Sequence, residues 1–553
     1  MKKFSFLALA LVLSLHPRAQ TGVTPQPSAR MNIVFFLVDD MGWSDLGCYG
    51  STFDKTPRID HFAKEAVRFT QAYAASHVCS PSRGAFLTGQ YPARTHLTDW
   101  LKGRLNYPFQ RLLNAPVVQH LPYGKPTLAR VLQENGYATA IFGKWHLGDD
   151  SASTERQGFD IHVPQWNEGW PHGTYFSPYH MKGLDGGPEG EYLTDRLTTE
   201  ALKWVDQHKD HPFFLYLSHF AVHDPIEGPP HLVEKYMNRL QHGSKPEQGP
   251  AYILEQNPDQ EHVFTRKELN NMLTDTAYSG YSVLPNRIVK VKQFQDNPEY
   301  AAMVESVDES LGRVLTRLKE DGLADNTIVI FASDNGAMSA ANFFKPERNI
   351  PLSMLNKAYS TSNLPLRGGK GWLYEGGIRV PTIIYWPHHG LHGAVSDVPI
   401  MNIDFYPTLL AMIGIKPPEK YPLDGMSIVP LLKGDTPGLA AIEKRPLYWH
   451  FPQYSNHGAQ SPGGAIRVGD YKLLEYFEHD KVQLFDLKTD PGEQHDLSAE
   501  QPQRVKQLRE MLSNWRKGIH ANMPSPNPNY ISSLGDQWQD WHPVKDSDKK
   551  PKR

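Results

Sequence analysis

The chain has 553 residues, of which 57 are basic and 60 acidic, and its formal net charge at neutral pH is −3. This balance argues against proteins that bind nucleic acid or an anionic membrane surface mainly by charge. The length allows more than one domain with a large core, and the two cysteines, Cys48 and Cys79, form a disulfide by default if the protein is exported.

The N-terminus has the composition of a secretory signal peptide. Lys2 and Lys3 precede an apolar run, Phe4 to Leu15, and Ala19 offers a small residue for cleavage. The run is too short to cross a bilayer; the alternative is a buried N-terminal helix. We therefore predict a signal peptide over residues 1–20, a polar linker over 21–30, and a mature protein that is periplasmic or extracellular, without a membrane span.

Residues 31–434 alternate between short runs rich in Ile, Val and Phe and amphipathic helical patterns. This alternation predicts an α/β domain with a mixed, largely parallel sheet sandwiched by helices. The expected strands are 32–38, 138–142, 213–217, 327–332 and 382–386. Three helices are expected. The first begins at Pro57, with Thr56 as its cap and with Ala66 and Val67 on its apolar face. The other two span about 127–135 and 299–318.

The pattern changes after about Gly434. Close-spaced runs at 465–468, 471–476 and 482–487 predict an antiparallel sheet, and an amphipathic helix follows over about 499–515. We expect a smaller C-terminal α+β domain over 435–525 and a partly disordered tail over 526–553. Residues 239–292 show weak periodicity and are expected to form an insertion on the main domain.

Polar side chains follow four of the predicted strands, whereas ordinary turns would show Gly, Pro and Ser. Ligands of open α/β sheets bind beyond the carboxyl ends of the strands, so these side chains are candidates for one site. They are Asp39 and Asp40, Lys144 and His146, His219 and His223, and Asp334 and Asn335.

The oxygen-bearing pairs favour a hard cation, Ca²⁺ or Mg²⁺, over zinc. Taken singly, Asp39-Asp40 could cap a turn, and Asp334-Asn335-Gly336 is a common turn sequence. Their position at two strand ends of one sheet favours the metal. His219 and His223 follow a strand, not a helix face, so a zinc pair is disfavoured and His219 is interpreted as structural.

The segment Cys79-Ser80-Pro81-Ser82-Arg83-Gly84 combines a nucleophile with an anion site. Pro81 suits the first turn of a helix, which places Cys79 at a helix N-terminus, where backbone amides favour an anion. Arg83 lies one turn further on the same side. The alternatives are a buried free cysteine or a disulfide with Cys48.

This segment, followed by Leu87-Thr88-Gly89, resembles the signature of type I sulfatases, the formylglycine-dependent branch of the alkaline-phosphatase-like superfamily. The resemblance covers roughly residues 31–515, and the further matching blocks occur in the family's order. They are Asp39–Gly42, Gly143–Gly148, Ser333–Gly336, Arg367–Gly371, Glu375–Pro381, Leu484–Leu487 and Asp490–Glu493. His223 fits the family's His-x-Pro pattern, with Asp224 as an uncommon filler.

The resemblance implies roles for these positions. Asp39, Asp40, Asp334 and Asn335 bind Ca²⁺ or Mg²⁺ together with the formylglycine oxygen at position 79. Hydrated formylglycine attacks sulfur, and Arg83 helps to keep it reactive. Lys144, Lys370 and His223 grip the sulfate. His223 protonates the leaving alcohol, and His146 removes the proton that allows sulfate to be expelled. A formylglycine-generating maturation enzyme is the implied partner.

The substrate implied is a sulfated carbohydrate, because the protein is expected to be exported and aromatic residues gather after the Lys144 strand. Galactose-type or N-acetylgalactosamine-type sulfates are one guess. The rivals are a phosphonate or phosphodiester hydrolase on the same scaffold, a non-catalytic glycan-binding protein, and a disulfide-stabilised scaffold. The candidate pocket residues are His77, His96, His162, His172 and His180, with Trp166, Trp170, Tyr175 and Tyr179.

Overall fold

The structure is a computed structural model that describes residues 30–148, 153–184, 186–242, 249–278, 283–342 and 355–534. The predicted signal peptide and nearly all of the linker lie outside these residues, as does most of the predicted tail. Within the described ranges, no helix combines the length and the apolar character that crossing a bilayer requires.

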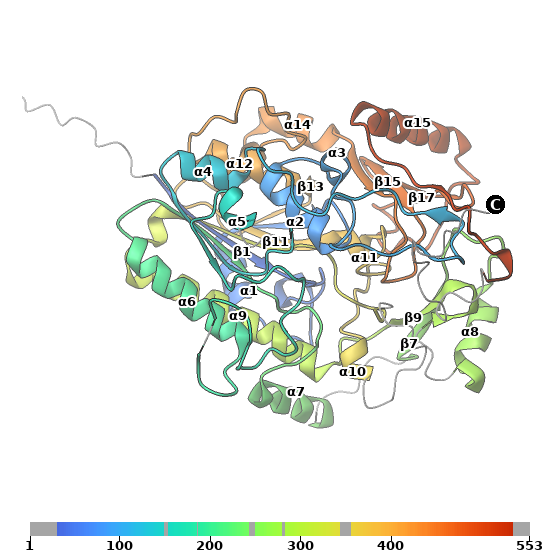
Figure 1. Ribbon diagram of the computed structural model, residues 1–553, viewed down its shortest axis with the longest axis horizontal. Helices are drawn as coiled ribbons and strands as arrows, with labels where there is room; N and C mark the ends of the chain where they lie inside the picture. Colours follow the sequence, from blue (N-terminus) through green and yellow to red (C-terminus); the bar gives the residue numbers. More distant parts are fainter. Residues whose placement is uncertain are drawn as a thin grey trace, which may run out of the picture.

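A nine-stranded sheet forms the centre of the molecule (Figure 1). Its middle strands β10, β1, β6, β4 and β5 are parallel, and β11 is antiparallel to both of its neighbours, β10 and β2. The predicted mixed, largely parallel sheet is therefore confirmed. In spatial order the strands are β12 (Ala394–Ser396), β2 (Val67–Tyr73), β11 (Arg379–Tyr385), β10 (Thr327–Ser333), β1 (Asn32–Val38), β6 (Phe213–Ser218), β4 (Ala138–Gly143) and β5 (Ile161–Val163), with β13 (Ile400–Met401) also paired to β2.

Helices cover both faces of this sheet because its central strands are apolar on both sides. Along β1, Val34 and Phe36 face one buried cluster and Ile33 and Phe35 face the other, as the two-residue period of a strand requires. One face is covered by α1 (Pro57–Glu65), α6 (Leu193–His208) and α9 (Pro298–Glu320). The other is covered by α2 (Cys79–Thr88), α4 (Leu128–Glu134), α12 (Phe405–Met412) and α13 (Val429–Lys433) (Figure 1).

The C-terminal part is an antiparallel sheet, as predicted, and β14 adds a fourth strand to the three that the sequence predicts. Its strands are β14 (Leu447–Phe451), β15 (Gly463–Val468), β16 (Tyr471–Tyr476) and β17 (Val482–Asp486). Helix α15 (Pro502–Gly518) packs one face with Leu508 and Leu512. The opposite face contributes Trp449 and Leu474 to a cluster shared with the main domain.

The remaining elements are short or belong to the predicted insertion, which holds a three-stranded sheet and a helix. Strand β18 pairs antiparallel with β3, and just beyond it Asn527 N donates to Arg111 O at 2.8 Å. These elements are α7 (Pro230–His242), β7 (Tyr252–Glu255), α8 (Arg266–Thr274), β8 (Val283–Leu284), β9 (Ile288–Lys292), α3 (Pro92–Thr95), β3 (Leu112–Leu113), α5 (Ser153–Arg156), α10 (Leu355–Ala358), α11 (Glu375–Ile378), α14 (Thr436–Lys444) and β18 (Ser525–Pro526).

Two local predictions need correction. Thr56 is the N-cap residue of α1, as predicted, but its side chain makes no capping hydrogen bond; the hydroxyl accepts from Gly47 N at 2.9 Å and donates to Asp60 Oδ1 at 3.0 Å. Helix α1 also ends at Glu65, and Val67 begins β2. The segment after Glu65 contains β-branched and aromatic residues, which favour a strand over another helical turn, and it pairs with β11.

Candidate active site

Four parallel strands deliver their following residues to one edge of the sheet. Asp39 and Asp40 follow β1, and Asp334 follows the neighbouring β10. Lys144 follows β4, and His223 lies in the turn after β6. The convergence that the strand ends predict is therefore confirmed, and it places these side chains in direct contact.

Three buried carboxylates form the centre of the site. Asp39, Asp40 and Asp334 are at most 2% exposed. Asp334 Oδ1 accepts from the backbone N–H of Asp40 at 3.1 Å. Asn335 Nδ2 donates to Asp40 Oδ1 at 2.7 Å. Three buried carboxylates repel one another, so the fold has to provide positive charge around them.

Three basic side chains each pair with one of these carboxylates. Lys144 Nζ lies 2.5 Å from Asp39 Oδ2, and Lys370 Nζ lies 2.7 Å from Asp40 Oδ2. Arg83 Nε donates to Asp334 Oδ2 at 2.7 Å. The protein's own charges in this cluster therefore sum to about zero before any ligand or ion is added.

Arg83 also ties the strands together. Its Nη1 donates to Ser218 Oγ at 2.6 Å and to Lys144 O at 3.1 Å. The acids around it increase its already high pKa, although burial alone would lower it. Arg83 thus remains charged and joins α2 to the ends of β4, β6 and β10.

The carboxylates differ in their affinity for a proton. Burial alone would raise the pKa of Asp39, but Lys144, His223 and Arg83 together hold it far below its usual range. Burial and the neighbouring charge of Asp39 raise the pKa of Asp334 to about 6. A divalent cation beside these groups would favour the ionised form of both.

Cys79 is the first residue of α2 and is buried against the carboxylates. Its Sγ lies 3.6 Å from Asp39 Oδ1 and 4.0 Å from Asp40 Oδ1. Cys79 and Cys48 are both free, which excludes the disulfide interpretation. The side chain at position 79 therefore lies at a helix N-terminus and beside the acidic centre, as the sequence predicts.

The donor set fits a hard divalent cation. Asp39, Asp40, Cys79 and His223 bring possible ligand atoms within 4.8 Å of one another. Among the described residues, Asn335 Oδ1 is buried without a hydrogen-bond partner, and a buried amide oxygen of this kind requires one. Carboxylate and amide oxygens are the ligands that Ca²⁺ and Mg²⁺ take.

His223 forms a close pair with Asp224, the residue that departs from the family pattern. The two are joined by His223 Nδ1 and Asp224 Oδ1 at 2.6 Å, and Nε2 lies 3.7 Å from Asp40 Oδ2. Burial and Lys370 act to lower the pKa of His223, but Asp224, Asp40 and Asp39 together raise it well above its usual range. His223 is therefore protonated at neutral pH.

His146 is in the opposite state. Its Nε2 lies 2.8 Å from Leu101 O, and the backbone of Gly169 lies against its ring. Burial and the charge of Lys144 lower its pKa well below the usual range. Of the two histidines predicted to transfer protons, His223 is thus protonated and His146 neutral, the arrangement needed for a separate acid and base.

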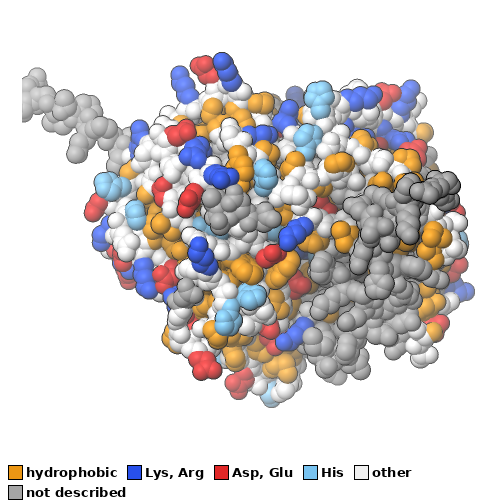
Figure 2. All heavy atoms as spheres, in the orientation of Figure 1, with side chains coloured by type: hydrophobic (Ala, Val, Ile, Leu, Met, Phe, Trp, Pro, Cys, Tyr) orange, Lys and Arg blue, Asp and Glu red, His pale blue; other side chains and the backbone are white. Residues whose placement is uncertain are grey.

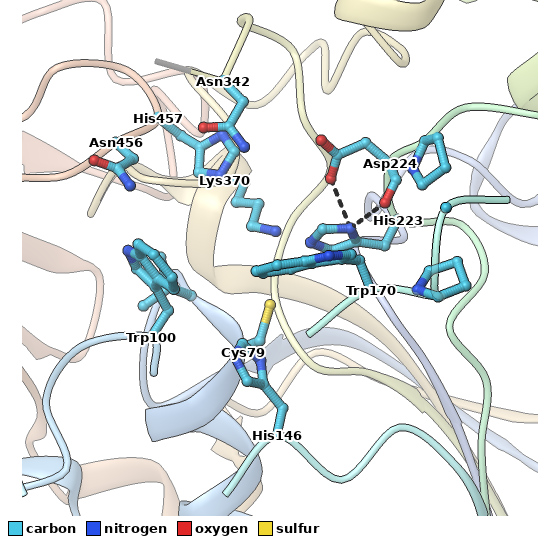
Figure 3. A pocket seen from close by; sticks show the side chains of 14 residues that line it. Cys79, Trp100, His146, Trp170, His223, Asp224, Asn342, Lys370, Asn456 and His457 are labelled. Carbon is cyan, nitrogen blue, oxygen red and sulfur yellow. Dashed lines mark hydrogen bonds and ion pairs between the residues drawn. The ribbon is translucent and has the colours of Figure 1, made fainter. Parts of the chain in front are cut away.

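A pocket of about 400 Å³ opens above Cys79, and Figure 3 shows the sulfur atom pointing toward it. Its floor is made by Cys79, Lys370, His223 and His146. Its walls include Trp100, Trp170, Asp224, Asn342, Asn456 and His457.

The predicted aromatic pocket is correct for Trp170 alone. Tyr175 and Tyr179 are buried and donate to backbone carbonyls, with Tyr175 OH 2.7 Å from Phe220 O. Trp166 donates to Trp170 O at 2.7 Å and so supports its loop. Among the described residues that line the pocket, the histidines predicted for it are missing: His77, His96, His162, His172 and His180.

His219 is structural, as interpreted from the sequence. It packs on Phe36 and contacts Ser310 Oγ at 2.9 Å. The residues that the sequence did not reveal are Ser218, Trp100, Asn342, Asn456 and His457. Ser218 is the last residue of a strand, and the other four come from loops or from the C-terminal part, so no local pattern marks them.

Comparisons with known proteins agree with this geometry. The family model described as Sulfatase matches residues 31–415. A second model, N-sulphoglucosamine sulphohydrolase, C-terminal, matches residues 369–518.

Curated relatives match over nearly the whole chain. The N-acetylglucosamine-6-O-sulfatase of Bacteroides thetaiotaomicron is 27% identical and covers 94% of this chain and 90% of its own. The human N-acetylgalactosamine-6-sulfatase is 29% identical, covering 91% and 88%. The mouse steryl-sulfatase is 29% identical, covering 96% and 88%.

Solved structures share the fold. Ps i-CgsB in complex with k-i-k-neocarrahexaose has a TM-score of 0.62 and 27% identity, covering 92% of this chain and 97% of that one. The phosphonate monoester hydrolase of Agrobacterium radiobacter has a TM-score of 0.59 at 20% identity, covering 90% and 100%, which shows the fold alone.

Proposed function

Since the chain belongs to the sulfatase family and is a sulfuric ester hydrolase, we propose that it removes O-sulfate from a sulfated carbohydrate, with Cys79 converted to formylglycine beside a bound Ca²⁺ or Mg²⁺. The observation that carries this proposal is the position of Cys79. Its side chain lies at the start of α2, within 4.0 Å of two of the buried carboxylates and at the bottom of a pocket.

Formylglycine and the cation would supply the parts of the reaction that ordinary side chains lack. Formylglycine, once hydrated, offers one hydroxyl as the nucleophile and a second through which sulfate is released, and the cation lowers the pKa of the attacking hydroxyl. Asp39, Asp40, Asp334 and Asn335 would hold the cation. A plain thiol or serine hydroxyl at position 79 would leave a stable covalent sulfate.

The charge balance supports an anionic substrate. The three carboxylates are already answered by Arg83, Lys144 and Lys370, so a bound divalent cation gives the site two net positive charges. A sulfate ester carries one negative charge, and the deprotonated nucleophile carries another. Lys370 lines the pocket and is held by Asp40, so it needs little rearrangement to stabilise charge on the sulfate oxygens. Lys144 is fully buried against Asp39 and would act on the same charge from behind the pocket floor.

The two histidines divide the proton transfers. His223, held by Asp224, is protonated and faces the pocket (Figure 3), so it is our candidate acid for the leaving alcohol. His146 is neutral and also lines the pocket, so it is our candidate base for the second hydroxyl at position 79. Their opposite pKa shifts are the basis of this assignment.

A carbohydrate is favoured as the alcohol part of the substrate. Two of the relatives are named as an N-acetylglucosamine-6-O-sulfatase and an N-acetylgalactosamine-6-sulfatase, and so act on sugar sulfates. A third is named as a steryl-sulfatase. Trp170 is 36% exposed at the pocket, which suits a sugar ring. We further propose that residues 1–20 direct export and that a formylglycine-generating enzyme matures the chain.

The rival function is hydrolysis of phosphonate or phosphodiester esters, because a phosphonate monoester hydrolase shares the fold. Rates on aryl sulfate, aryl phosphodiester and aryl phosphonate separate the two. We expect kcat/KM to be highest for the sulfate; a higher value for either phosphorus ester would favour the rival.

Mass spectrometry of the peptide that contains Cys79 tests the proposed mechanism. Protein made with a co-expressed maturation enzyme should carry formylglycine and hydrolyse a sulfate ester. Protein made without it should keep the thiol and not turn over, and Cys79→Ala should fold but be inactive. An unmodified thiol in a preparation with full activity would overturn the mechanism.

A further inference from the structure

The walls of the Cys79 pocket differ in charge from its floor. Building on the proposed function, we propose that these walls select a neutral sugar ring bearing one sulfate and reject sugars with a second anionic group next to it. Asp224, Trp100 and Trp170 are the residues that determine this specificity.

Positive charge is confined to the floor. Lys370 is the one lysine or arginine among the described residues that line the pocket, and its Nζ is directed to Asp40 at 2.7 Å. His223 is likewise held between Asp40 and Asp224. Both side chains lie where the reacting sulfate would bind and are not placed to pair with a second anion higher in the pocket.

The upper walls offer aromatic and neutral polar groups. Trp100 and Trp170 come from two separate loops and lie around the space above the Cys79 sulfur (Figure 3). Asn342 and Asn456 contribute amides, and the Asn456 oxygen accepts from Arg104. Indole faces pack against the C–H groups of a pyranose, and amides pair with its hydroxyl groups.

His457 adds no charge to this wall. It is buried at the tip of the loop after β14, and burial and Lys370 lower its pKa well below the usual range. It is therefore a neutral imidazole at the pH at which the enzyme would work. Its contribution to a ligand is a hydrogen bond and not an ion pair.

Asp224 gives the wall a negative charge. Its side chain is 29% exposed and lines the pocket. Its Oδ1 lies 2.6 Å from His223 Nδ1, which holds the carboxylate at this wall. Such a group accepts hydrogen bonds from sugar hydroxyls or amides, and it repels a carboxylate or second sulfate within several ångströms.

Pairs of sugars that differ by one anionic group test this proposal directly. The probes are N-acetylglucosamine 6-sulfate against glucosamine 2-N,6-O-disulfate, and N-acetylgalactosamine 6-sulfate against its 4,6-disulfate. Calorimetry with calcium-loaded Cys79→Ala protein measures binding without turnover. We expect each monosulfate to bind about tenfold or more tightly than its disulfate. Equal or tighter binding of the disulfates, or no binding of any of the four, would overturn the proposal.

Variants then identify the residues responsible. In the Cys79→Ala background, Trp170→Ala should weaken binding of the monosulfates by about tenfold, whereas Tyr123→Ala, an aromatic change outside the pocket, should leave it unchanged. Asp224→Asn should reduce the preference for monosulfate over disulfate several-fold. An unchanged preference in Asp224→Asn would remove Asp224 from the specificity.

Failure of the proposed function would look different. In that case the mature wild-type enzyme would hydrolyse neither a sugar sulfate nor an aryl sulfate. Turnover of aryl sulfate, together with loss of the selectivity described above, would leave the sulfatase activity intact and overturn only the choice of sugar.

Discussion

Replacing Lys472 with methionine should destabilise the protein far more than replacing an exposed lysine such as Lys203. Lys472 is fully buried, and its Nζ lies 3.0 Å from Glu375 Oε1 and 2.9 Å from Glu493 Oε1. Glu493 Oε2 also accepts from the backbone N–H of Glu375 at 2.6 Å. The lysine therefore contacts both buried carboxylates, where the C-terminal sheet meets the segment that follows Lys370; Glu375 also has Arg379 Nη1 at 3.6 Å.

The size of the stability loss follows from the carboxylates that remain buried after the lysine is removed. Removing one member of a buried ion pair costs about 3–5 kcal/mol because the remaining charge is unpaired. Here two carboxylates remain, and burial already raises the pKa of Glu493 to about 7, even with Lys472 opposing the shift. Protonation of a carboxylate relieves the repulsion, so the loss should be smaller at pH 5 than at pH 8.

Urea unfolding followed by tryptophan fluorescence measures this loss. The control is Lys203→Met, since Lys203 pairs with Glu200 at 3.0 Å but is 62% exposed, and such pairs contribute about 0–1 kcal/mol. The double variant Lys472→Met with Glu493→Gln should recover part of the stability, because one of the two charges is gone. A loss in Lys472→Met no larger than in Lys203→Met, or one that grows toward low pH, would refute this reasoning.

Three further predictions concern the site and its support. Asp334→Ala should abolish turnover and bound Ca²⁺ together, which elemental analysis and a rate assay check; full activity after thorough chelation would contradict it. Lys370→Ala should lower kcat/KM by about a hundredfold or more, and a near-normal rate would remove Lys370 from sulfate binding. Burial raises the pKa of Asp99 to about 7, so its contribution to stability is present below pH 4 and is lost as the pH rises to 7. Asp99→Asn should therefore gain stability relative to wild type across that window in thermal unfolding, and a difference independent of pH would contradict the assignment.

The central sheet and the acidic centre were predictable because both depend on local order. A buried parallel strand is a short apolar run, and the residue after it must lie at the carboxyl edge of the sheet. The positions of Asp39, Asp334 and Lys144 at this edge could therefore be predicted without knowing which strands are neighbours. Strand β2 was missed because its apolar and polar residues resemble the end of the preceding helix, and only its pairing with β11 shows that it is extended.

The walls of the pocket could not be predicted in the same way. Trp100 lies in a loop without regular structure, and His457 is 378 positions along the chain from Cys79 by its number. Their meeting depends on how the C-terminal sheet docks on the main domain, and no periodicity in the sequence encodes a docking angle. The aromatic segment after β4 shows the same limit, since three of its four candidate aromatics are used for packing or support and one faces the pocket.

The docking of the C-terminal sheet also explains how Lys370 keeps its position. Gly371 N donates to His77 O at 3.1 Å, and a side chain at Gly371 would collide with the backbone of His457, 2.3 Å from the position of its Cβ. Leu373 N donates to Gln460 Oε1 at 2.7 Å. The segment that presents Lys370 to Asp40 is thus held on one side by the residues before Cys79 and on the other by the C-terminal domain. Because this domain also contributes Asn456 and His457 to the pocket, the catalytic floor and the substrate walls are aligned by the same contacts, and neither can shift without the other.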